Sequence, residues 1–377
     1  MLTPYQVKAL IPRTWPLFFA RHGRFTPVQE VAIPPIMAGH DTLVTAATAA
    51  GKTEAVIAPL LERWWEHAQE SQLTILYICP TRALVRDLAE RLQPLLANTA
   101  VKLATKTGDF APLSSQRPPS ILLTTPESAD SLLTRSPKLF ITTRAIVLDE
   151  IHLFDNTPRG DHVRCLLERI ERIRTYALPK ARPTQRVALS ATVLDAAGVM
   201  ARYLGETADH VSIPGGRHIS AEIRPLYDLG ELAGALTERA ARKTLLFCNS
   251  RHEVEKTAAY LRQKLSHHAE IFVHYSTLDS QMRQEVEARF ASAATAICVC
   301  TSTLELGIDI GTVDDVALLG APADLNGFLQ RIGRGGRRTE EMRVLCLPKS
   351  PREWAQFEAL LAVAQGSWPL SLAHSGR

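Results

Sequence analysis

Residues 42–53 read TLVTAATAAGKT, a short β-branched run followed by a loop that ends in Gly51-Lys52-Thr53. We expect an amphipathic helix over Lys52–His67, and the order strand, loop, helix is the context that a phosphate-binding loop requires. In such a loop, backbone N–H groups at the helix start face a phosphate, the lysine reaches the β- and γ-phosphate oxygens, and the threonine hydroxyl binds Mg²⁺. The alternative is a chance Gly-Lys-Thr in an ordinary turn.

The loop has alanine where phosphate loops often have glycine, at Ala46 and Ala49. Alanine avoids positive φ angles, so we expect the loop to be built without one at Ala49. The residues that we expect around a bound nucleotide are Ala49, Ala50, Gly51, Lys52, Thr53 and Glu54.

Two adjacent acids form the second candidate feature. Residues 144–152 read RAIVLDEIH, an apolar strand that ends in Asp149 and Glu150. Acids at the carboxyl end of a parallel strand lie at the edge of the sheet where ligands bind. Asp149 is placed to hold Mg²⁺ together with Thr53, and Glu150 to orient and deprotonate an attacking water. The alternative is a solvated acid pair that caps the strand.

Short strands alternate with longer helical stretches along the whole chain, which predicts parallel sheets built from βαβ units. In the first half we expect strands at Thr42–Ala46, Thr74–Ile78, Val101–Thr105, Ile121–Thr124, Ala145–Leu148 and Arg186–Leu189. Helices are expected between them, including Lys52–His67, Leu84–Leu95 and Arg159–Ile173. Residues 211–217 contain two glycines and a proline and read as a linker.

The same alternation starts again after this linker. The expected strands are Thr244–Phe247, Ile271–His274, Ala296–Val299, Val316–Leu319 and Arg343–Leu347, with helices such as Glu253–Leu265, Gln281–Phe290 and Arg352–Gln365. We therefore expect a first α/β domain over residues 1–210, a second over 211–350, and a C-terminal helix and tail over 351–377. A length of 377 residues fits two domains of about 150 residues each.

Composition narrows the class of protein only slightly. The net charge of +4, from 43 basic and 39 acidic residues, permits nucleic-acid binding without requiring it. We expect no membrane span and no signal peptide, because no long apolar run is present and the N-terminus lacks a basic start and a cleavage site. The six cysteines include no CxxC pair, so we expect no zinc site, and buried free thiols indicate a cytoplasmic location.

Further motifs follow one another between residues 24 and 350. They are Phe25–Gln29, Pro80–Leu84, Thr107–Asp109, Thr125–Glu127, Asp149–His152, Ser190–Thr192, Leu246–Arg251, Thr301–Asp309 and Gln330–Arg337. In this order they resemble the motifs of superfamily 2 helicases. Three features are most similar to the Lhr-type (large helicase-related) group: the sequence of residues 301–309, the short segment between them and Gln330, and Pro158–Gly160. The segment His274-Tyr-Ser276 departs from the His-His-Gly that is usual in this group.

The resemblance implies two tandem RecA-like domains with parallel sheets and an ATP site in the cleft between them. It implies that Gln29 reads adenine and that Gly307 and Asp309 also contact ATP. Arg334 and Arg337 would act as arginine fingers, with Gln330 near the γ-phosphate, and such fingers accelerate hydrolysis by about 10³–10⁵. The alternative for this basic run is a solvated helix turn that binds phosphate backbone.

The resemblance also implies nucleic-acid contacts and residues that couple them to ATP. The expected contacts are Thr81, Arg82, Thr125 and Thr301, which follow strand ends where they grip phosphates without reading bases. Each of them is equally compatible with helix capping. His152, Ser190 and Thr192 are the expected coupling residues, and we expect Trp64 and Trp65 to pack rather than to stack on bases.

The expected function is ATP-dependent movement along single-stranded or forked nucleic acid by a monomeric motor, with DNA favoured over RNA and a 3′ to 5′ direction implied by the resemblance. A DEAD-box-like RNA remodeller is one alternative, against which the box Asp149–His152 and Gln330 argue. A decayed nucleic-acid-binding scaffold is another, against which the filled catalytic positions argue. The residues after Arg338 are too few for a winged-helix domain, so we expect poorly processive unwinding.

Overall fold

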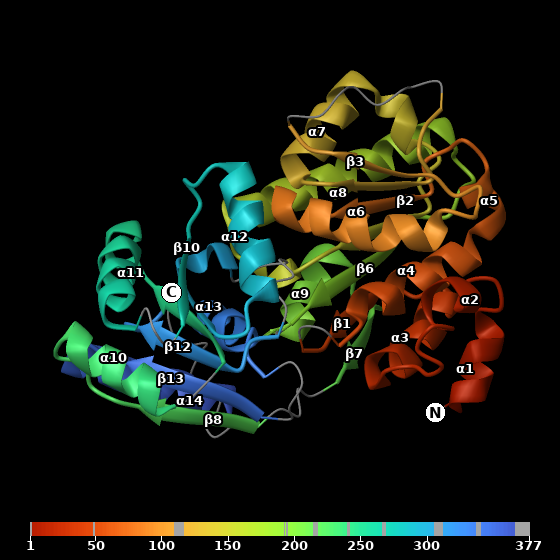
Figure 1. Cartoon of the computed structure of the whole chain (residues 1–377). Helices are drawn as coiled ribbons and strands as arrows, with labels where there is room; N and C mark the ends of the chain where they lie inside the picture. The colour runs from red at the N-terminus through yellow and green to blue at the C-terminus, as the bar shows by residue number, and fades with distance from the viewer. Residues whose placement is uncertain are drawn as a thin grey trace. The chain divides into compact units, whose positions relative to one another are not determined.

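The computed structural model describes residues 2–47, 50–108, 117–191, 193, 195–213, 218–239, 242–265, 269–304, 312–336 and 341–365. The chain forms two compact units, Met1–Gly215 and Gly216–Arg377. The boundary therefore lies after residue 215, whereas we expected it after residue 210. Each unit is an α/β structure with its own sheet (Figure 1).

The first unit is built on a seven-stranded sheet with the order β3-β4-β2-β5-β6-β1-β7, in which every pair of neighbours is parallel. Its strands are β1 (Thr42–Thr45), β2 (Ile75–Ile78), β3 (Leu103–Lys106), β4 (Ile121–Thr124), β5 (Ala145–Leu148), β6 (Gln185–Ser190) and β7 (Asp209–Ser212). The central strands are buried along their whole length, which is why they read as continuous apolar runs.

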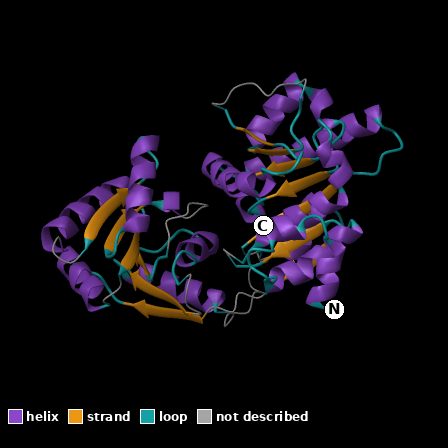
Figure 2. Ribbon diagram, turned by 45° about the vertical axis from the view of Figure 1, so that its right-hand side comes forward, coloured by secondary structure: helices purple, strands orange, loops and turns teal. Residues whose placement is uncertain are grey.

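Helices cover both faces of this sheet (Figure 2). One core cluster joins the sheet to α3, α4 and α6, and a second joins it to α7, α8 and α9. The helices are α1 (Pro4–Leu10), α2 (Trp15–Phe18), α3 (Pro27–Ala38), α4 (Lys52–Arg63), α5 (Trp65–Gln69), α6 (Arg82–Leu96), α7 (Pro126–Arg135), α8 (Pro158–Ala177) and α9 (Ala196–Tyr203), with short 3-10 turns η1 (Pro137–Phe140) and η2 (Ile151–Leu153).

Two local expectations for this unit need correction. The expected helix Lys52–His67 is broken at Trp64, whose φ of −112° and ψ of 27° leave the helical region, so that α5 starts anew at Trp65. Val211 and Ser212, which we placed in the linker, belong to β7, where Val211 pairs with Val44 and is buried. The strand was missed because β7 lies at the edge of the sheet and contributes only this one buried residue.

The second unit contains a six-stranded sheet with the order β10-β11-β9-β12-β13-β8, again parallel throughout. Its strands are β8 (His218–Ile223), β9 (Lys243–Cys248), β10 (Glu270–His274), β11 (Ala296–Cys300), β12 (Asp315–Leu319) and β13 (Glu341–Leu347). Its helices are α10 (Leu229–Glu238), α11 (Arg251–Leu265), α12 (Ser280–Ser292), α13 (Leu325–Ile332) and α14 (Pro351–Ala364), with a 3-10 turn η3 (Ser302–Leu304).

The C-terminal helix α14 is part of the second unit rather than a separate appendage. Phe357, Leu360 and Leu361 are buried in the same core cluster as residues of β11 and β12. Among the helices that the structure describes, none has the length and apolar character needed to cross a membrane.

Candidate functional site

The phosphate loop follows β1 at the carboxyl edge of the first sheet. Gly51 ends the loop and caps α4 with a φ of 86°, a left-handed angle that favours glycine. A Cβ atom at this position would lie 2.4 Å from Nε2 of Gln29, so a larger residue would have to displace that side chain as well as adopt the strained φ. Ala49, which we expected without a positive φ, lies outside the described residues.

The motif Phe25–Gln29 contacts this loop from the side. The Thr26 hydroxyl donates to the carbonyl of Ala50 at 2.8 Å, and Nε2 of Gln29 donates to the carbonyl of Gly51 at 3.3 Å. Oε1 of Gln29 accepts from the backbone N–H of Thr26 at 2.9 Å. Gln29 is therefore buried between the start of α3 and the phosphate loop, and its reading of adenine stays a prediction.

The side chain of Lys52 folds back onto the loop. Its Nζ donates to the carbonyl of Ala46 at 2.6 Å and to that of Ala47 at 3.2 Å, and the side chain is buried. An ammonium group held by loop carbonyls can exchange them for phosphate oxygens without a large movement of the chain. The contact of Lys52 with nucleotide phosphates stays a prediction.

Glu54, which we expected near a bound nucleotide, forms an ion pair within the protein. Its Oε1 accepts from the Arg91 guanidinium on α6 at 2.9 Å, and Asp87 lies 3.6 Å from the same guanidinium. This ion pair joins α4 to α6, so the carboxylate of Glu54 is engaged by protein. Its contact with a nucleotide stays a prediction.

Asp149 lies at the end of β5, buried, with an oxygen 3.0 Å from the phenol oxygen of Tyr77 on β2. Its other oxygen accepts from the backbone N–H of Glu150 at 3.0 Å. Burial, reinforced by the charge of Glu150, raises the pKa of Asp149 to about 7, although Tyr77 and the charge of Lys52 pull it down. A cation bound here would favour the ionised carboxylate.

Tyr77 is a site residue that the sequence analysis missed. Its hydroxyl contacts both residues expected to bind Mg²⁺, because it donates to Asp149 and the Thr53 side chain also hydrogen-bonds to it. Burial first, and then the charge of Asp149, raise the pKa of Tyr77 well above its usual value, so the phenol is neutral. The only sequence signal was a hydroxyl-bearing side chain within an otherwise apolar strand.

The shared contact with Tyr77 places Thr53 and Asp149 in one cradle. A hydroxyl and a carboxylate are the hard oxygen donors that Mg²⁺ prefers, and this ion usually takes one or two protein carboxylates and completes its shell with water and phosphate. Thr53 and Asp149 therefore fit Mg²⁺.

Glu150 has a strained backbone. Its φ of 48° and ψ of 52° lie in the left-handed region, which non-glycine residues rarely adopt and which costs about 1–3 kcal/mol. A left-handed backbone conformation directs the side chain to a position that a regular helix or strand would not reach. Within the described chain, the buried Oε2 of Glu150 accepts no hydrogen bond, although Nδ1 of His152 lies 3.4 Å away.

His152 connects the acid pair to the motif after β6. Its Nδ1 lies 2.7 Å from Oγ of Ser190 and 3.4 Å from Oε2 of Glu150. A histidine between these two side chains can transmit a movement of one to the other, and the coupling role of His152 and Ser190 stays a prediction. Thr192, the third predicted coupling residue, lies outside the described residues.

The predicted nucleic-acid contacts in the first unit sit at two adjacent helix starts. Thr81 caps α6, where its hydroxyl oxygen accepts from the backbone N–H of Leu84 at 3.2 Å, and Arg82 is the first residue of that helix. Thr125 precedes α7 and donates to Oγ of Ser128 at 3.2 Å. Capping therefore accounts for Thr81, while both helices still point their N-terminal N–H groups toward the same edge of the sheet.

In the second unit, Thr301 belongs to a hydrogen-bonded chain around a buried histidine. Oγ1 of Thr301 lies 3.5 Å from that of Thr303, which lies 2.8 Å from Nδ1 of His274. Nε2 of His274 lies 3.0 Å from Oε1 of Glu287 on α12. His274 therefore has a defined structural role, although the two residues after it depart from His-His-Gly.

Gln330 and Arg334, the predicted catalytic residues at the end of α13, are buried. Their neighbour Arg331 donates to Oδ1 of Asn249 at 3.0 Å and stacks on Phe247, with 5.6 Å between the guanidinium carbon and the ring centroid. Arg331 thus ties this motif to the one after β9, a role that the sequence did not reveal. Gly307, Asp309 and Arg337 lie outside the described residues.

Comparison with known proteins agrees with these features. Residues 26–197 match the DEAD/DEAH box helicase family, and residues 227–339 match the helicase conserved C-terminal domain. The ATP-dependent RNA helicase DBP8 of Candida albicans is 30% identical over 340 residues, which cover 83% of this chain and 73% of that protein. The chain belongs to the superfamily 2 helicases.

The similarity to the Lhr-type group is also confirmed. The ATP-dependent helicase Lhr-Core protein 2 of Thermococcus barophilus is 30% identical over 381 residues, covering 90% of this chain and 43% of that protein. The structure of the Mycobacterium smegmatis helicase Lhr with ssDNA and AMP-PNP superimposes with a TM-score of 0.78 at 27% identity, over 94% of this chain and 49% of that one. The expected pair of RecA-like domains is thus confirmed, and the chain spans about two fifths of the length of its Lhr-Core relatives.

Proposed function

We propose that this chain is an ATP-driven motor that moves along single-stranded nucleic acid. The observation that carries the proposal is the grouping of Lys52, Thr53, Asp149 and Glu150 at one edge of the first sheet, with Tyr77 contacting both predicted magnesium ligands. Phosphoryl transfer depends mainly on such positioned charges and needs little covalent chemistry from the protein.

Each residue has a separate task in hydrolysis. Lys52 neutralises the β- and γ-phosphates, and the N–H groups at the start of α4 bind their oxygens. Thr53 and Asp149 would hold Mg²⁺, which when bound would draw charge from the phosphate oxygens. Glu150 orients a water and accepts its proton. Arg334 and Arg337 supply positive charge to the γ-phosphate, with Gln330 beside it, and thereby make hydrolysis depend on the second unit.

The substrate that we propose is single-stranded or forked DNA, held by its phosphates. Thr81, Arg82 and Thr125 lie at adjacent helix starts, where hydroxyls, N–H groups and one guanidinium suit phosphate oxygens. The similarity to an Lhr protein in complex with ssDNA supports DNA, and movement in the 3′ to 5′ direction is implied by the resemblance alone. The six free cysteines, five of them buried, fit the cytoplasmic location that we also propose.

RNA remodelling is the second candidate, because the Candida albicans relative is an RNA helicase. The test is the ATPase rate of the full chain with no oligonucleotide, with single-stranded DNA, and with RNA of the same sequence and length. We expect stimulation by DNA to exceed stimulation by RNA. Equal or stronger stimulation by RNA would favour the remodeller, and no ATPase under any condition would reject both. The Glu150→Gln variant is the control for contaminating ATPase.

A further inference from the structure

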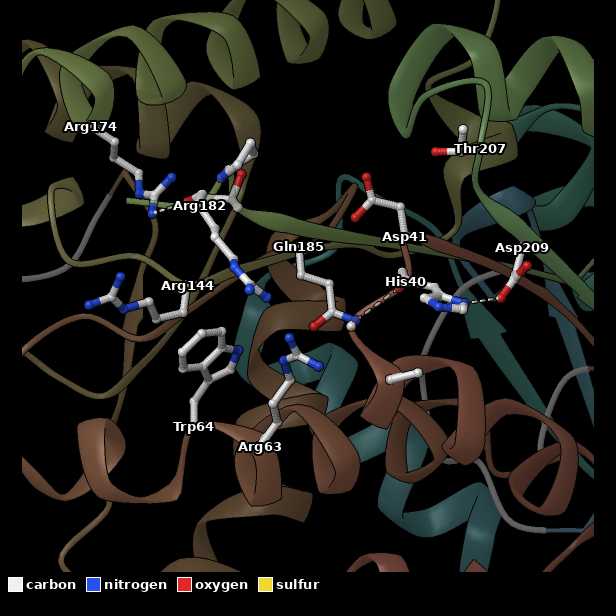
Figure 3. A pocket seen from close by; sticks show the side chains of 14 residues that line it. His40, Asp41, Arg63, Trp64, Arg144, Arg174, Arg182, Gln185, Thr207 and Asp209 are labelled. Carbon is white, nitrogen blue, oxygen red and sulfur yellow. Dashed lines mark hydrogen bonds and ion pairs between the residues drawn. The ribbon is translucent and has the colours of Figure 1, made fainter. Parts of the chain in front are cut away.

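A second set of positive charges lies at the opposite edge of the first sheet, where its parallel strands begin. Four residues mark this edge. Asp41 precedes β1, Arg144 precedes β5, Gln185 starts β6 and Asp209 starts β7, so all four mark amino ends of parallel strands. Together with α4 and α8 they line a pocket of about 540 Å³ (Figure 3). The phosphate loop and Asp149 follow β1 and β5 at their carboxyl ends, about 13 Å away along four-residue strands. The pocket is therefore separate from the candidate ATP site.

Four arginines line this pocket: Arg63, Arg144, Arg174 and Arg182 (Figure 3). The indole of Trp64 lies between two of them, with its ring centroid 5.4 Å from the guanidinium carbon of Arg63 and 5.5 Å from that of Arg144. Burial, together with the neighbouring charge of Arg182, lowers the pKa of Arg63. Burial also lowers the pKa of Arg174, and the charge of Arg144 adds to this effect. The group is thus crowded with like charge.

The acids around the pocket have other partners. Glu171 accepts from Arg174 at 2.8 Å through one oxygen and from the Thr184 hydroxyl at 2.9 Å through the other. Asp209 lies 2.7 Å from Nδ1 of His40. Asp41 accepts from the backbone N–H of Arg186 at 2.7 Å, and burial raises its pKa, which opposes the negative charge.

The arginines themselves have few acceptors. Arg63 donates to the carbonyl of Met37 at 2.8 Å, and Arg174 donates to the carbonyl of Arg182 at 3.1 Å as well as to Glu171. Among the residues that the structure describes, the guanidiniums of Arg144 and Arg182 have no hydrogen-bond or ion-pair partner. The positive charge on this edge is therefore only partly compensated by protein.

Unpartnered polar atoms also concentrate here. Nine buried side-chain nitrogen and oxygen atoms lack a hydrogen-bond partner in the described part of the chain. Five of the nine belong to residues that line this pocket: Nε of Arg63, Arg144 and Arg174, Nε1 of Trp64 and Oε1 of Gln185. Folded proteins normally satisfy such groups. Four of the five are N–H donors, which makes the lining of this pocket rich in donors.

We propose that this pocket binds a small phosphate-bearing molecule through the guanidiniums of Arg63, Arg144, Arg174 and Arg182. A guanidinium binds phosphate oxygens with paired, charge-assisted hydrogen bonds. A phosphate group offers tetrahedrally arranged oxygens and at least one full negative charge, which suits donors that approach from several directions better than a planar carboxylate does. The volume lies within the range of small-molecule sites, about 300–1,000 Å³. This site is independent of the proposed motor function.

The test is calorimetric titration of the full chain with inorganic pyrophosphate in the absence of Mg²⁺. Every protein in the series carries Lys52→Ala, which weakens binding at the phosphate loop. The pocket variant adds Arg144→Gln and Arg182→Gln, and it leaves the deeply buried Arg174 in place. The matched control adds Arg172→Gln and Lys180→Gln, which remove two exposed charges from the same unit outside the pocket. Thermal unfolding checks that all three proteins fold.

We expect the pocket variant to bind pyrophosphate at least about tenfold more weakly than its parent, because it loses charge-assisted hydrogen bonds. The control variant should remain within about twofold of the parent, since its exposed charges act only through screened, long-range attraction. Succinate should bind more weakly than pyrophosphate. Equal pyrophosphate affinity in the parent and pocket variant would overturn the proposal. It would also be overturned if the pocket substitutions weakened binding of a short single-stranded DNA while pyrophosphate binding stayed unchanged, because the surface would then be a contact for nucleic-acid phosphates.

Discussion

The hydroxyl of Tyr77 on β2 donates a hydrogen bond to Oδ2 of Asp149 at the end of β5, with 3.0 Å between the two oxygens. The bond crosses between two neighbouring buried strands, and Thr53 hydrogen-bonds to the same hydroxyl. Tyr77 is therefore a positioning residue for both predicted magnesium ligands, while it has no chemical step of its own.

Tyr77→Phe should raise the Mg²⁺ concentration needed for half-maximal ATPase and lower the maximal rate by about tenfold. A lost hydrogen bond to a buried charged group costs about 1.5–3 kcal/mol, and about 1.4 kcal/mol corresponds to a factor of ten. The measurement is ATPase rate against Mg²⁺ concentration. Tyr176→Phe is the control, because Tyr176 is 91% exposed. An unchanged Mg²⁺ dependence in Tyr77→Phe would show that the contact does not position the ion.

Lys52→Ala and Glu150→Gln should both abolish hydrolysis but differ in nucleotide affinity. Lys52 carries the charge that faces the phosphates, so its loss should weaken ATP binding as well as turnover. Glu150→Gln removes the proton acceptor and leaves Lys52, Thr53 and Asp149 in place, so ATP should bind and persist. Equilibrium binding of a fluorescent ATP analogue and single-turnover hydrolysis separate the two. Near wild-type hydrolysis by Glu150→Gln would exclude the role proposed for this carboxylate.

A fragment of residues 1–215 should fold and bind ATP with Mg²⁺ but hydrolyse it only slowly, because Arg334 and Arg337 belong to the second unit. A fragment of residues 1–205 should be markedly less stable, since it lacks β7 and leaves Leu43 and Val44 of β1 without a neighbouring strand on that side. Thermal unfolding and ATPase of the two fragments provide the comparison. Vigorous hydrolysis by residues 1–215 would refute the requirement for arginines from the second unit.

The sequence predicted the strands and their polar ends well, because a parallel strand buried on both faces has an apolar pattern that stops where the chain reaches the ligand edge. The glycine in the motif Pro158–Gly160 also has a local structural explanation. A Cβ atom at Gly160 would lie 2.2 Å from the carbonyl oxygen of Phe154 and 2.5 Å from the hydroxyl oxygen of Tyr203, so the start of α8 requires glycine.

What the sequence could not reveal depends on contacts between distant residues. Tyr77 lies inside an apolar strand, where an aromatic residue predicts only packing. The four pocket arginines are spread from residue 63 to residue 182, and only the sheet order brings them to one edge. We expected Trp64 only to pack, yet it separates α4 from α5 and lies between two guanidiniums.

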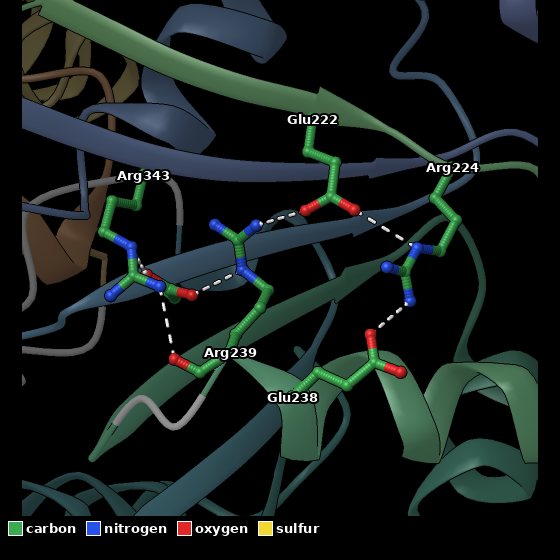
Figure 4. A network of polar contacts seen from close by, with 6 residues as sticks. Glu222, Arg224, Glu238, Arg239 and Arg343 are labelled. Atoms are coloured by element: carbon green, nitrogen blue, oxygen red, sulfur yellow. Dashed lines mark hydrogen bonds and ion pairs between the residues drawn. The ribbon is translucent and has the colours of Figure 1, made fainter.

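A buried ion cluster should determine the stability of the second unit. Asp315, at the start of β12, accepts from Nε of Arg239 at 2.6 Å and lies 3.0 Å from Nε of Arg343, with 3% of its side chain exposed. Arg239 also donates to Glu222 at 2.8 Å, which extends the network to β8 (Figure 4). Removing the central acid leaves two guanidiniums without their shared partner.

Asp315→Asn should therefore destabilise the second unit by about 1–3 kcal/mol, because Arg239 keeps Glu222 and Arg343 is partly exposed. The more exposed ion pair between Glu238 and Arg224 offers a control, and Glu238→Gln should destabilise the unit far less, because exposed ion pairs contribute little to stability. Thermal unfolding followed by circular dichroism gives the order of stabilities. If the two variants unfold at the same temperature, the cluster contributes no more than a surface ion pair.

Finally, the stability of the magnesium-free protein should depend on pH through Asp149. Burial and Glu150 raise its pKa to about 7, against about 4 in the unfolded chain, despite the opposing effects of Tyr77 and Lys52. Between these two values the native state binds more protons than the unfolded state, so the free energy of unfolding falls as pH rises, and the full cost is present above about pH 7. Asp149→Asn cannot ionise, so its melting temperature should exceed that of the wild type by more at pH 8 than at pH 5. Glu206→Gln, at an exposed position, should show no such trend. A difference between Asp149→Asn and wild type that stayed constant from pH 5 to pH 8 would mean that the carboxylate ionises in the folded chain as easily as in the unfolded one.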